Sequence, residues 1–412
     1  MGTGVLELPG NVRKLGWAPG LTLIVLFFPV NLYTGWLLSR LSRRHPQALS
    51  YGELASASAG RRWAKITHAF MATYFCSVLG GYVLVLAESV QGLVSSMCLF
   101  PASLLSGLIL LGPVQLRSLH SLAGLSVISA LTIAAAVTIC LWELGAGRGV
   151  GVQAAGAEQG GDAVAPEDDA AAVDGPVWFA DSSFVDKFTA VTGIVFAYAG
   201  QSVFLEMISE MVTPAHFPRA LLAAGPFMVG IYLLVTVVGY GNLGAATPAN
   251  IMESLAPGHA KTFANMLMLV HMVISYLITS QVLSRFVHTR VAPTTADEHG
   301  ARGKLHWALI SGGVLAWSIF VSNGLPFFDD LTGIIGALLA SNISYGLPSL
   351  FALASATRGA LELIKHERLL MAALLLLTVV LVVLGLYTNI RHTIADSREW
   401  GAPFSCHSAE EG

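Results

Sequence analysis

Long apolar segments separated by short polar loops fill almost the whole chain. A helix needs roughly 20 apolar residues to cross a bilayer. Ten segments come close to or exceed that length, at residues 18–39, 66–92, 99–115, 119–143, 189–211, 220–243, 262–286, 305–323, 331–355 and 369–390. A shorter apolar stretch, from Gly2 to Val12, precedes them. The pattern predicts an all-α, polytopic membrane protein of eleven helices whose first helix is truncated.

The first apolar stretch is too short to cross a bilayer by itself. At about 1.5 Å per residue, its roughly eleven residues cover about half of a ~30 Å hydrocarbon core. Two interpretations remain open: the first span is a natural half-helix, or Met1 is not the true start and half a helix precedes it. We favour the second.

One apolar segment, residues 192–214, is long enough to cross a bilayer but is interrupted in its middle, at residues 197–200. Unwound backbone at membrane depth is tolerated only where protein or a water-filled cavity satisfies its polar groups. A second glycine-containing interruption, at residues 2–4, lies in the first segment. Matched interruptions in the two halves of a transporter indicate its substrate site. The alternative is that these small residues only allow two helices to pack closely.

Composition narrows the class of protein. Hydrophobic residues make up 54% of the 412 residues and charged residues only 11%, whereas about a quarter of the residues of a soluble protein are charged. The net charge of −3 gives no reason to expect a nucleic-acid partner. Most of the 22 Lys and Arg residues fall in loops on one side, which assigns that side to the cytoplasm and the C-terminus to the opposite side. The membrane itself, plasma or vacuolar/lysosomal, stays open.

The sequence contains no recognisable catalytic or metal-binding pattern. It has no G-x-S-x-G, H-E-x-x-H or G-x-x-x-x-G-K-[ST] motif, and its four cysteines are not in C-x-x-C spacing. We therefore expect neither an enzyme nor an ATP-driven pump, and no cofactor or metal.

A single transmembrane domain, residues 1–412, is expected. Helices 1–5 occupy residues 1–143, and helices 6–10 occupy residues 187–355. Residues 356–412 hold helix 11 and a tail. Between the halves, residues 144–186 are rich in Gly, Ala and acidic side chains, a composition that predicts a disordered linker outside the membrane.

Four acidic residues lie within predicted spans or at their ends: Glu7, Glu88, Glu206 and Glu210. An ionised side chain inside a membrane is energetically costly, so such a residue is a candidate functional residue. Glu206 is a candidate for gating or proton coupling, with a structural partnership as the alternative, and Glu210 is interpreted as a cap at the cytoplasmic end. His271 is a second proton-coupling candidate, although packing is the favoured interpretation. Ser275 and Thr279, stacked one turn apart on the same helix, are candidate sodium ligands or ordinary helix hydroxyls.

Five motifs follow one another along the chain: GTGVLELP at residues 2–9, LGWAPG at 15–20, YTGWLL at 33–38, SYGEL at 50–54 and FAYAG at 196–200. Together they resemble the amino acid/auxin permease family, and the similarity extends in weaker form over nearly the whole chain. The resemblance implies a leucine-transporter-like core of five plus five inverted-repeat helices followed by an eleventh.

The same resemblance implies secondary transport of amino acids or related small zwitterions across a membrane. Alternating access would be coupled to protons in preference to sodium. Carried over by position, the substrate site comprises Gly2, Thr3, Gly4 and Leu6 on helix one and Phe196, Tyr198, Ala199 and Gly200 on helix six. A transporter-like amino acid sensor without net transport is the alternative.

Overall fold

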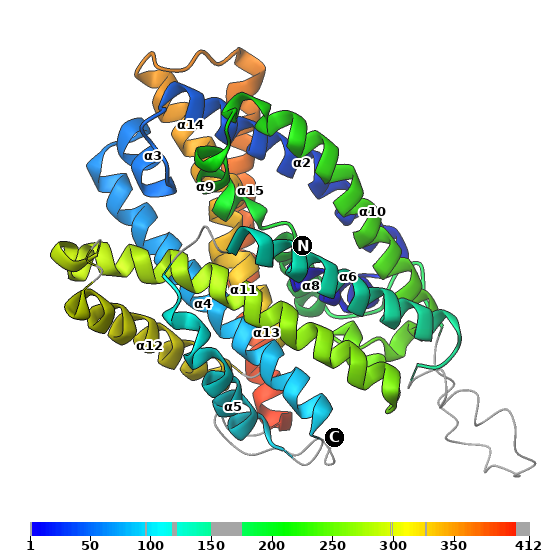
Figure 1. The fold of residues 1–412 in the computed structure, drawn as a ribbon. Coiled ribbons are helices and arrows are strands. Elements are labelled where there is room, and N and C mark those ends of the chain that lie inside the picture. The colour runs from blue at the N-terminus through cyan, green and yellow to red at the C-terminus, as the bar shows by residue number, and fades with distance from the viewer. Residues whose placement is uncertain are drawn as a thin grey trace, which may run out of the picture. The chain divides into compact units, whose positions relative to one another are not determined.

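The computed structural model describes residues 2–94, 97–117, 122–149, 175–296, 298, 300–325 and 328–400. Helices dominate these residues. They are α1 (Gly4–Leu15), α2 (Trp17–Arg44), α3 (Tyr51–Ser58), α4 (Arg61–Leu93), α5 (Leu99–Leu111), α6 (Leu122–Gly145), α8 (Phe184–Ala197), α9 (Phe204–Glu210), α10 (Phe217–Leu243), α11 (His259–Val291), α12 (Ala301–Gly324), α13 (Phe328–Ile334), α14 (Leu347–Thr357) and α15 (Lys365–Trp400) (Figure 1). Most of the predicted linker, residues 150–174, lies outside the described part of the chain.

The predicted spans coincide with helices. Nine helical stretches among the described residues are long and apolar enough to cross a membrane, and the chain is a multi-pass integral membrane protein. The prediction of a full span at 99–115 was too long: α5 has 13 residues and stops before a 3-10 turn, Pro113–Gln115. A proline has no N–H for the helical ladder.

The span predicted at 331–355 is irregular in the structure. Between α13 and α14, the backbone forms two π-helical turns, η7 (Ile335–Ala340) and η8 (Asn342–Gly346). The first turn lies so close to α8 that a Cβ added to Gly336 would collide with the carbonyl oxygen of Thr192. Such turns occur often at functional sites.

Contacts divide the chain into two compact units, and each unit draws on both halves of the sequence. Unit 1 comprises Met1–Tyr74, Val173–Ala249 and Thr332–His392. Within it, α2 lies alongside α10 (Figure 1). Helix α1 packs against α8, α10 and α2. Small residues permit the close approach: a Cβ on Gly35 would lie 2.6 Å from a methyl of Leu221.

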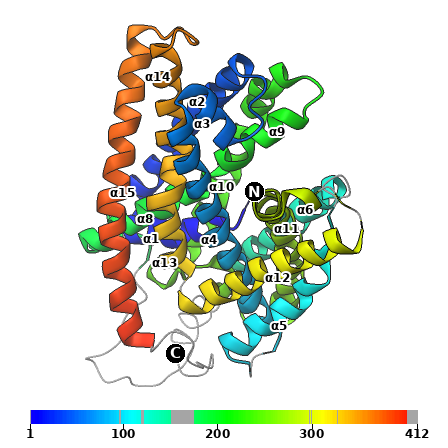
Figure 2. The same cartoon turned by 90° about the vertical axis from the view of Figure 1, so that its left-hand side faces the viewer.

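Unit 2 comprises Phe75–Ala172, Asn250–Leu331 and Thr393–Gly412. Its main contact is between α6 and α11, and α12 packs on both α5 and α11 (Figure 2). Buried polar pairs fix the helices relative to one another: the hydroxyls of Tyr276 and Ser318 lie 3.1 Å apart, and Asn323 donates to the hydroxyl of Ser103 at 2.8 Å.

Candidate functional site

The predicted break in the sixth span is present. Helix α8 ends at Ala197, residues 198 and 199 are non-helical, and the 3-10 turn η2 (Gly200–Val203) leads into the short helix α9. Tyrosine hydroxyls donate hydrogen bonds to backbone carbonyl groups at the break. The hydroxyl of Tyr232 donates to Ala197 O at 2.6 Å, and that of Tyr74 donates to Ala199 O at 3.3 Å.

The start of α1 lies directly against the end of α8. A Cβ added to Gly4 would lie only 2.6 Å from the Cα of Ala197, so only glycine allows this approach. Thr3 and Leu6, the neighbours of Gly4 in the predicted site, are buried. Gly2 is exposed, with nothing within 4 Å of its Cβ position. The structure thus brings the two predicted interruptions together through Gly4 and Ala197.

The remaining predicted site residues lie around the break. Phe196 is half-buried at the last turn of α8, and Gly200 opens η2, where a Cβ would meet the ring of Phe204 at 3.4 Å. Tyr198 is buried: its hydroxyl donates to Ile24 O at 2.6 Å, and its ring meets the edge of Tyr232. The tyrosine hydroxyl is therefore committed to α2, a contact that the sequence does not reveal.

A buried polar network holds η2 in place. The amide nitrogen of Gln201 donates to Asn31 Oδ1 at 2.6 Å and to Thr34 Oγ1 at 3.1 Å, and its amide oxygen accepts from Ser344 at 2.9 Å. Asn31 in turn donates to the hydroxyl of Tyr345 at 3.1 Å. These side chains connect the break with α2 and with the π-helical turn η8. Sequence reasoning did not assign them a role, although Asn31 and Gln201 are polar side chains inside apolar segments.

A tyrosine outside the spans supports the same π-helical turn. Tyr51, on α3, is fully buried and donates to Ile343 O at 3.1 Å. Burial, helped by the nearby Glu206 carboxylate, raises the pKa of Tyr51 well above its usual value, so the phenol remains a neutral donor.

The coupling candidates are divided between the two units. Glu206 lies on α9 in unit 1, partly buried. His271 lies on α11 in unit 2, where its Nδ1 is 2.8 Å from Ser129 Oγ, and Ser275 reaches the same hydroxyl at 3.4 Å. Thr279 forms a side-chain hydrogen bond with Tyr82. His271 and Ser275 thus share a partner, Ser129, that the sequence analysis did not single out.

Comparison with known proteins connects this geometry with a family. A family model described as "Transmembrane amino acid transporter protein" matches residues 1–391. The N amino acid transport system protein of Neurospora crassa is 26% identical over 353 residues, which cover 84% of this chain and 72% of the relative. The Amino acid transporter AVT1D of Arabidopsis thaliana is 23% identical, covering 85% of this chain and 60% of the relative.

A solved structure shares the fold. The crystal structure of MhsT in complex with L-phenylalanine superimposes with a TM-score of 0.57, covering 94% of this chain and 96% of that protein, at 12% sequence identity. The leucine-transporter-like fold predicted from the sequence is therefore confirmed.

Proposed function

Because the chain belongs to the transmembrane amino acid transporter family, we propose that it carries amino acids or related small zwitterions across a membrane by secondary active transport, coupled to protons. The observation that carries this proposal is the close contact between the start of α1 and the end of α8, at Gly4 and Ala197.

Opposite helix ends meet at that point. The N-terminus of α1 carries a partial positive charge and unpaired N–H groups, and the C-terminus of α8 carries a partial negative charge and carbonyl groups. A zwitterionic amino acid presents a carboxylate and an ammonium group a few ångströms apart. The carboxylate binds at the start of α1, near Thr3 and Gly4. The ammonium binds at the carbonyl groups of Tyr198 and Ala199. The Tyr198 oxygen, which accepts from the backbone N–H of Gly200, has a second lone pair for the ammonium.

The division into two units supports alternating access by rocking. Both interrupted helices belong to unit 1, together with α2 and α10, whereas α5, α6, α11 and α12 belong to unit 2. In the proposed cycle, rocking of a helix bundle opens the site first to one side of the membrane and then to the other, while the hydrogen bonds inside unit 1 persist.

Uptake into proteoliposomes tests the proposal. The purified full chain is reconstituted, and uptake of each of the twenty radiolabelled amino acids is measured with and without an inward-directed proton gradient. Saturable uptake of at least one amino acid, increased by the gradient, is the expected result. Saturable binding without uptake of any amino acid would instead identify a sensor and contradict transport.

A further inference from the structure

A stripe of polar side chains runs along one face of α1. Thr3, Glu7, Asn11 and Lys14 are separated by three or four residues, a spacing that places them on the same face of a helix. Each has at most 9% of its surface exposed. Ionisable and polar side chains buried in a membrane helix are expensive and mark the paths of ions and protons.

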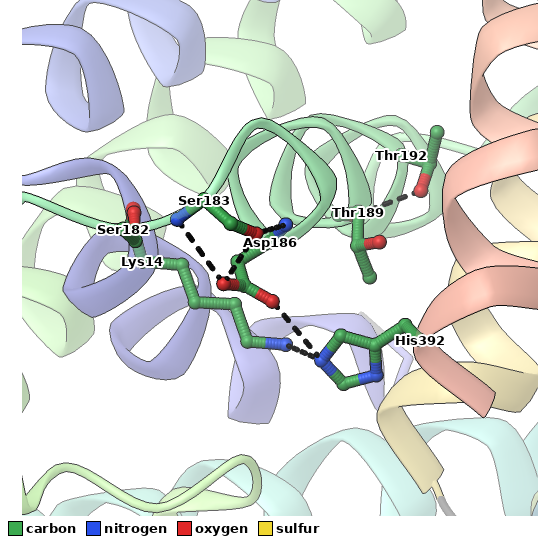
Figure 3. Close-up of polar contacts among 7 residues, drawn as sticks. All are labelled: Lys14, Ser182, Ser183, Asp186, Thr189, Thr192 and His392. Atoms are coloured by element: carbon green, nitrogen blue, oxygen red, sulfur yellow. Dashed lines mark hydrogen bonds and ion pairs between the residues drawn. The ribbon is translucent and has the colours of Figure 1, made fainter. Parts of the chain in front are cut away.

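At the C-terminal end of the stripe, three side chains from three helices meet. His392 Nε2 of α15 lies 3.4 Å from Lys14 Nζ of α1 and 3.7 Å from Asp186 Oδ1 of α8. Figure 3 shows the three side chains pointing toward one another. We call Lys14, Asp186 and His392 the entry cluster. It places an imidazole beside the polar face of α1.

Further polar contacts lie one turn along α15 from the entry cluster. Asn389 precedes His392 by three residues, on the same face of α15, and donates to Thr192 Oγ1 at 3.0 Å. The amide oxygen of Asn389 lies against Gly333, where a Cβ would collide with it. The neighbouring residue, Thr332, donates its hydroxyl to Glu7 Oε2 at 2.9 Å. A file of polar groups thus leads from the entry cluster to a buried carboxyl group.

Two further side chains between α1 and α8 have polar atoms without a hydrogen-bond partner among the described residues: Asn11 Nδ2 and Thr189 Oγ1. Asn11 and Thr189 are 6% and 2% exposed. Asn11 lies against Gly193 of α8, and Thr189 is one turn before Gly193 on the same face. Leaving such atoms unpaired costs roughly 1–3 kcal/mol each, and buried water molecules are their usual partners in proteins. The two buried polar atoms therefore extend the polar face between α1 and α8.

We propose that Glu7 is the carboxyl group that carries the coupling proton, and that the file of polar groups between α1, α8 and α15 connects it with the entry cluster. This inference rests on the proposed function as a proton-coupled transporter. The step is a proton transfer alone: the carboxylate of Glu7 accepts a proton and becomes a neutral acid, and it later releases that proton to the other side.

The position of Glu7 explains how proton and substrate are coupled. Glu7 is three residues after Gly4, less than one helical turn from the end of α1 that binds the substrate carboxylate. An ionised Glu7 repels that carboxylate, and protonation removes the repulsion, so that proton binding and substrate binding favour each other.

Other titratable side chains also lie on the helices that pack against α1. On α10, Tyr232 donates to Ala197 O, and Tyr240 accepts from the backbone N–H of Val177. The remaining ones are Lys187 on α8, Tyr33, Arg40, Arg43 and Arg44 on α2, and Tyr198 at the break. Asp330, two residues before Thr332 in the sequence, is also buried.

The test separates proton coupling from substrate movement. In proteoliposomes, counterflow measures the exchange of labelled for unlabelled amino acid and needs no net proton transfer, whereas accumulation driven by a pH gradient does. We expect Glu7→Gln to lower gradient-driven accumulation, and substrate-linked proton entry read by an internal pH dye, at least tenfold. Counterflow is expected to stay within about twofold of the natural protein. Glu210→Gln, the same change at an exposed carboxylate on α9, is the matched control and leaves both signals unchanged.

A second variant keeps the test decisive if Glu7→Gln disturbs folding. Asn389→Leu is nearly isosteric and interrupts the polar file without touching Glu7, and Asn242→Leu, at an exposed site on α10, is its control. We expect Asn389→Leu to slow proton entry at least tenfold and to preserve counterflow.

The other outcomes each contradict a defined claim. Absence of counterflow in the natural protein overturns the proposed function, and this inference with it. Counterflow in the natural protein without proton coupling, or with coupling to a sodium gradient, overturns the inference but leaves amino acid transport standing. Unchanged proton entry in Glu7→Gln, or loss of counterflow in both Glu7→Gln and Asn389→Leu, assigns these residues a structural role only.

Discussion

Replacing Gly4 with alanine tests the contact on which the proposed site depends. The added Cβ would lie 2.6 Å from Ala197 Cα, 3.0 Å from its Cβ and 3.2 Å from its backbone nitrogen. Ordinary carbon–carbon contacts are about 3.5–4.0 Å, so the start of α1 and the end of α8 must separate by roughly 1 Å. Because two of the three atoms are backbone, no side-chain rotation relieves the clash.

The size of the effect follows from this displacement. Overpacking of this kind costs roughly 1–3 kcal/mol, and each 1.4 kcal/mol corresponds to a tenfold change in an equilibrium constant. We expect Gly4→Ala to lower the thermal unfolding midpoint of the detergent-purified protein. We also expect amino acid binding about tenfold or more weaker, since the carboxylate and ammonium subsites move apart.

Gly230→Ala is the matched control for this experiment. Gly230 lies on α10 in the same unit, and nothing is within 4 Å of its Cβ position. The same substitution there should stabilise the helix by about 0.5–1 kcal/mol and leave binding unchanged. The reasoning is refuted if Gly4→Ala unfolds and binds like the natural protein, because the two interruptions would then not be in close contact.

Three further substitutions test single polar contacts, two of them around the break and one an ion pair between α2 and α15. Gln201→Leu leaves the buried Asn31 oxygen and the Ser344 hydroxyl without this partner, so we expect a loss of about 2–4 kcal/mol in the free energy of unfolding; an unchanged denaturation midpoint would contradict the network. Tyr232→Phe removes the donor to Ala197 O, which should cost about 1–3 kcal/mol in the free energy of unfolding; an unchanged denaturation midpoint would show that this hydrogen bond does not hold the end of α8. Arg40→Gln removes the ion pair with Glu367, 2.6 Å long and partly exposed; we expect a stability loss of about 1 kcal/mol or less that shrinks at high salt, and a loss independent of salt would point to packing instead.

The positions of the helices could be predicted from the sequence because each depends on a local pattern. An apolar segment of sufficient length becomes a membrane helix whatever surrounds it. The break after Ala197 was predictable for the same reason, since a glycine and small residues interrupt an otherwise continuous apolar segment. The exceptions have local causes as well: α5 ends early, at Leu111, shortly before Pro113.

The contacts between distant segments could not be predicted in the same way. The hydrogen bond between Asn31 and Tyr345 joins residues 314 positions apart, and that between Asn389 and Thr192 joins residues 197 apart. Each of these side chains, taken singly, fits a satisfied polar residue in a membrane helix equally well. Only the packing of α2, α8 and α15 in space makes them parts of a network and of a path.

The importance of individual glycines also depended on packing. The sequence presents Gly4 and Gly200 as equivalent members of two interruptions. In the structure, a Cβ on Gly4 collides with backbone, whereas one on Gly200 meets only the ring of Phe204 at 3.4 Å. The space around a glycine is set by the neighbouring element, which the sequence does not specify.

Competition by charge-deleted ligands tests the central claim most directly. For an amino acid that the purified protein binds, its amide lacks the carboxylate and its deaminated hydroxy acid lacks the ammonium group, while both keep the side chain. If the ends of α1 and α8 bind the two charges at Gly4 and Ala197, each analogue should compete at least a hundredfold more weakly than the parent, on the order of 3 kcal/mol per lost charged contact. Analogues that compete as well as the parent would show that the helix ends do not form the site.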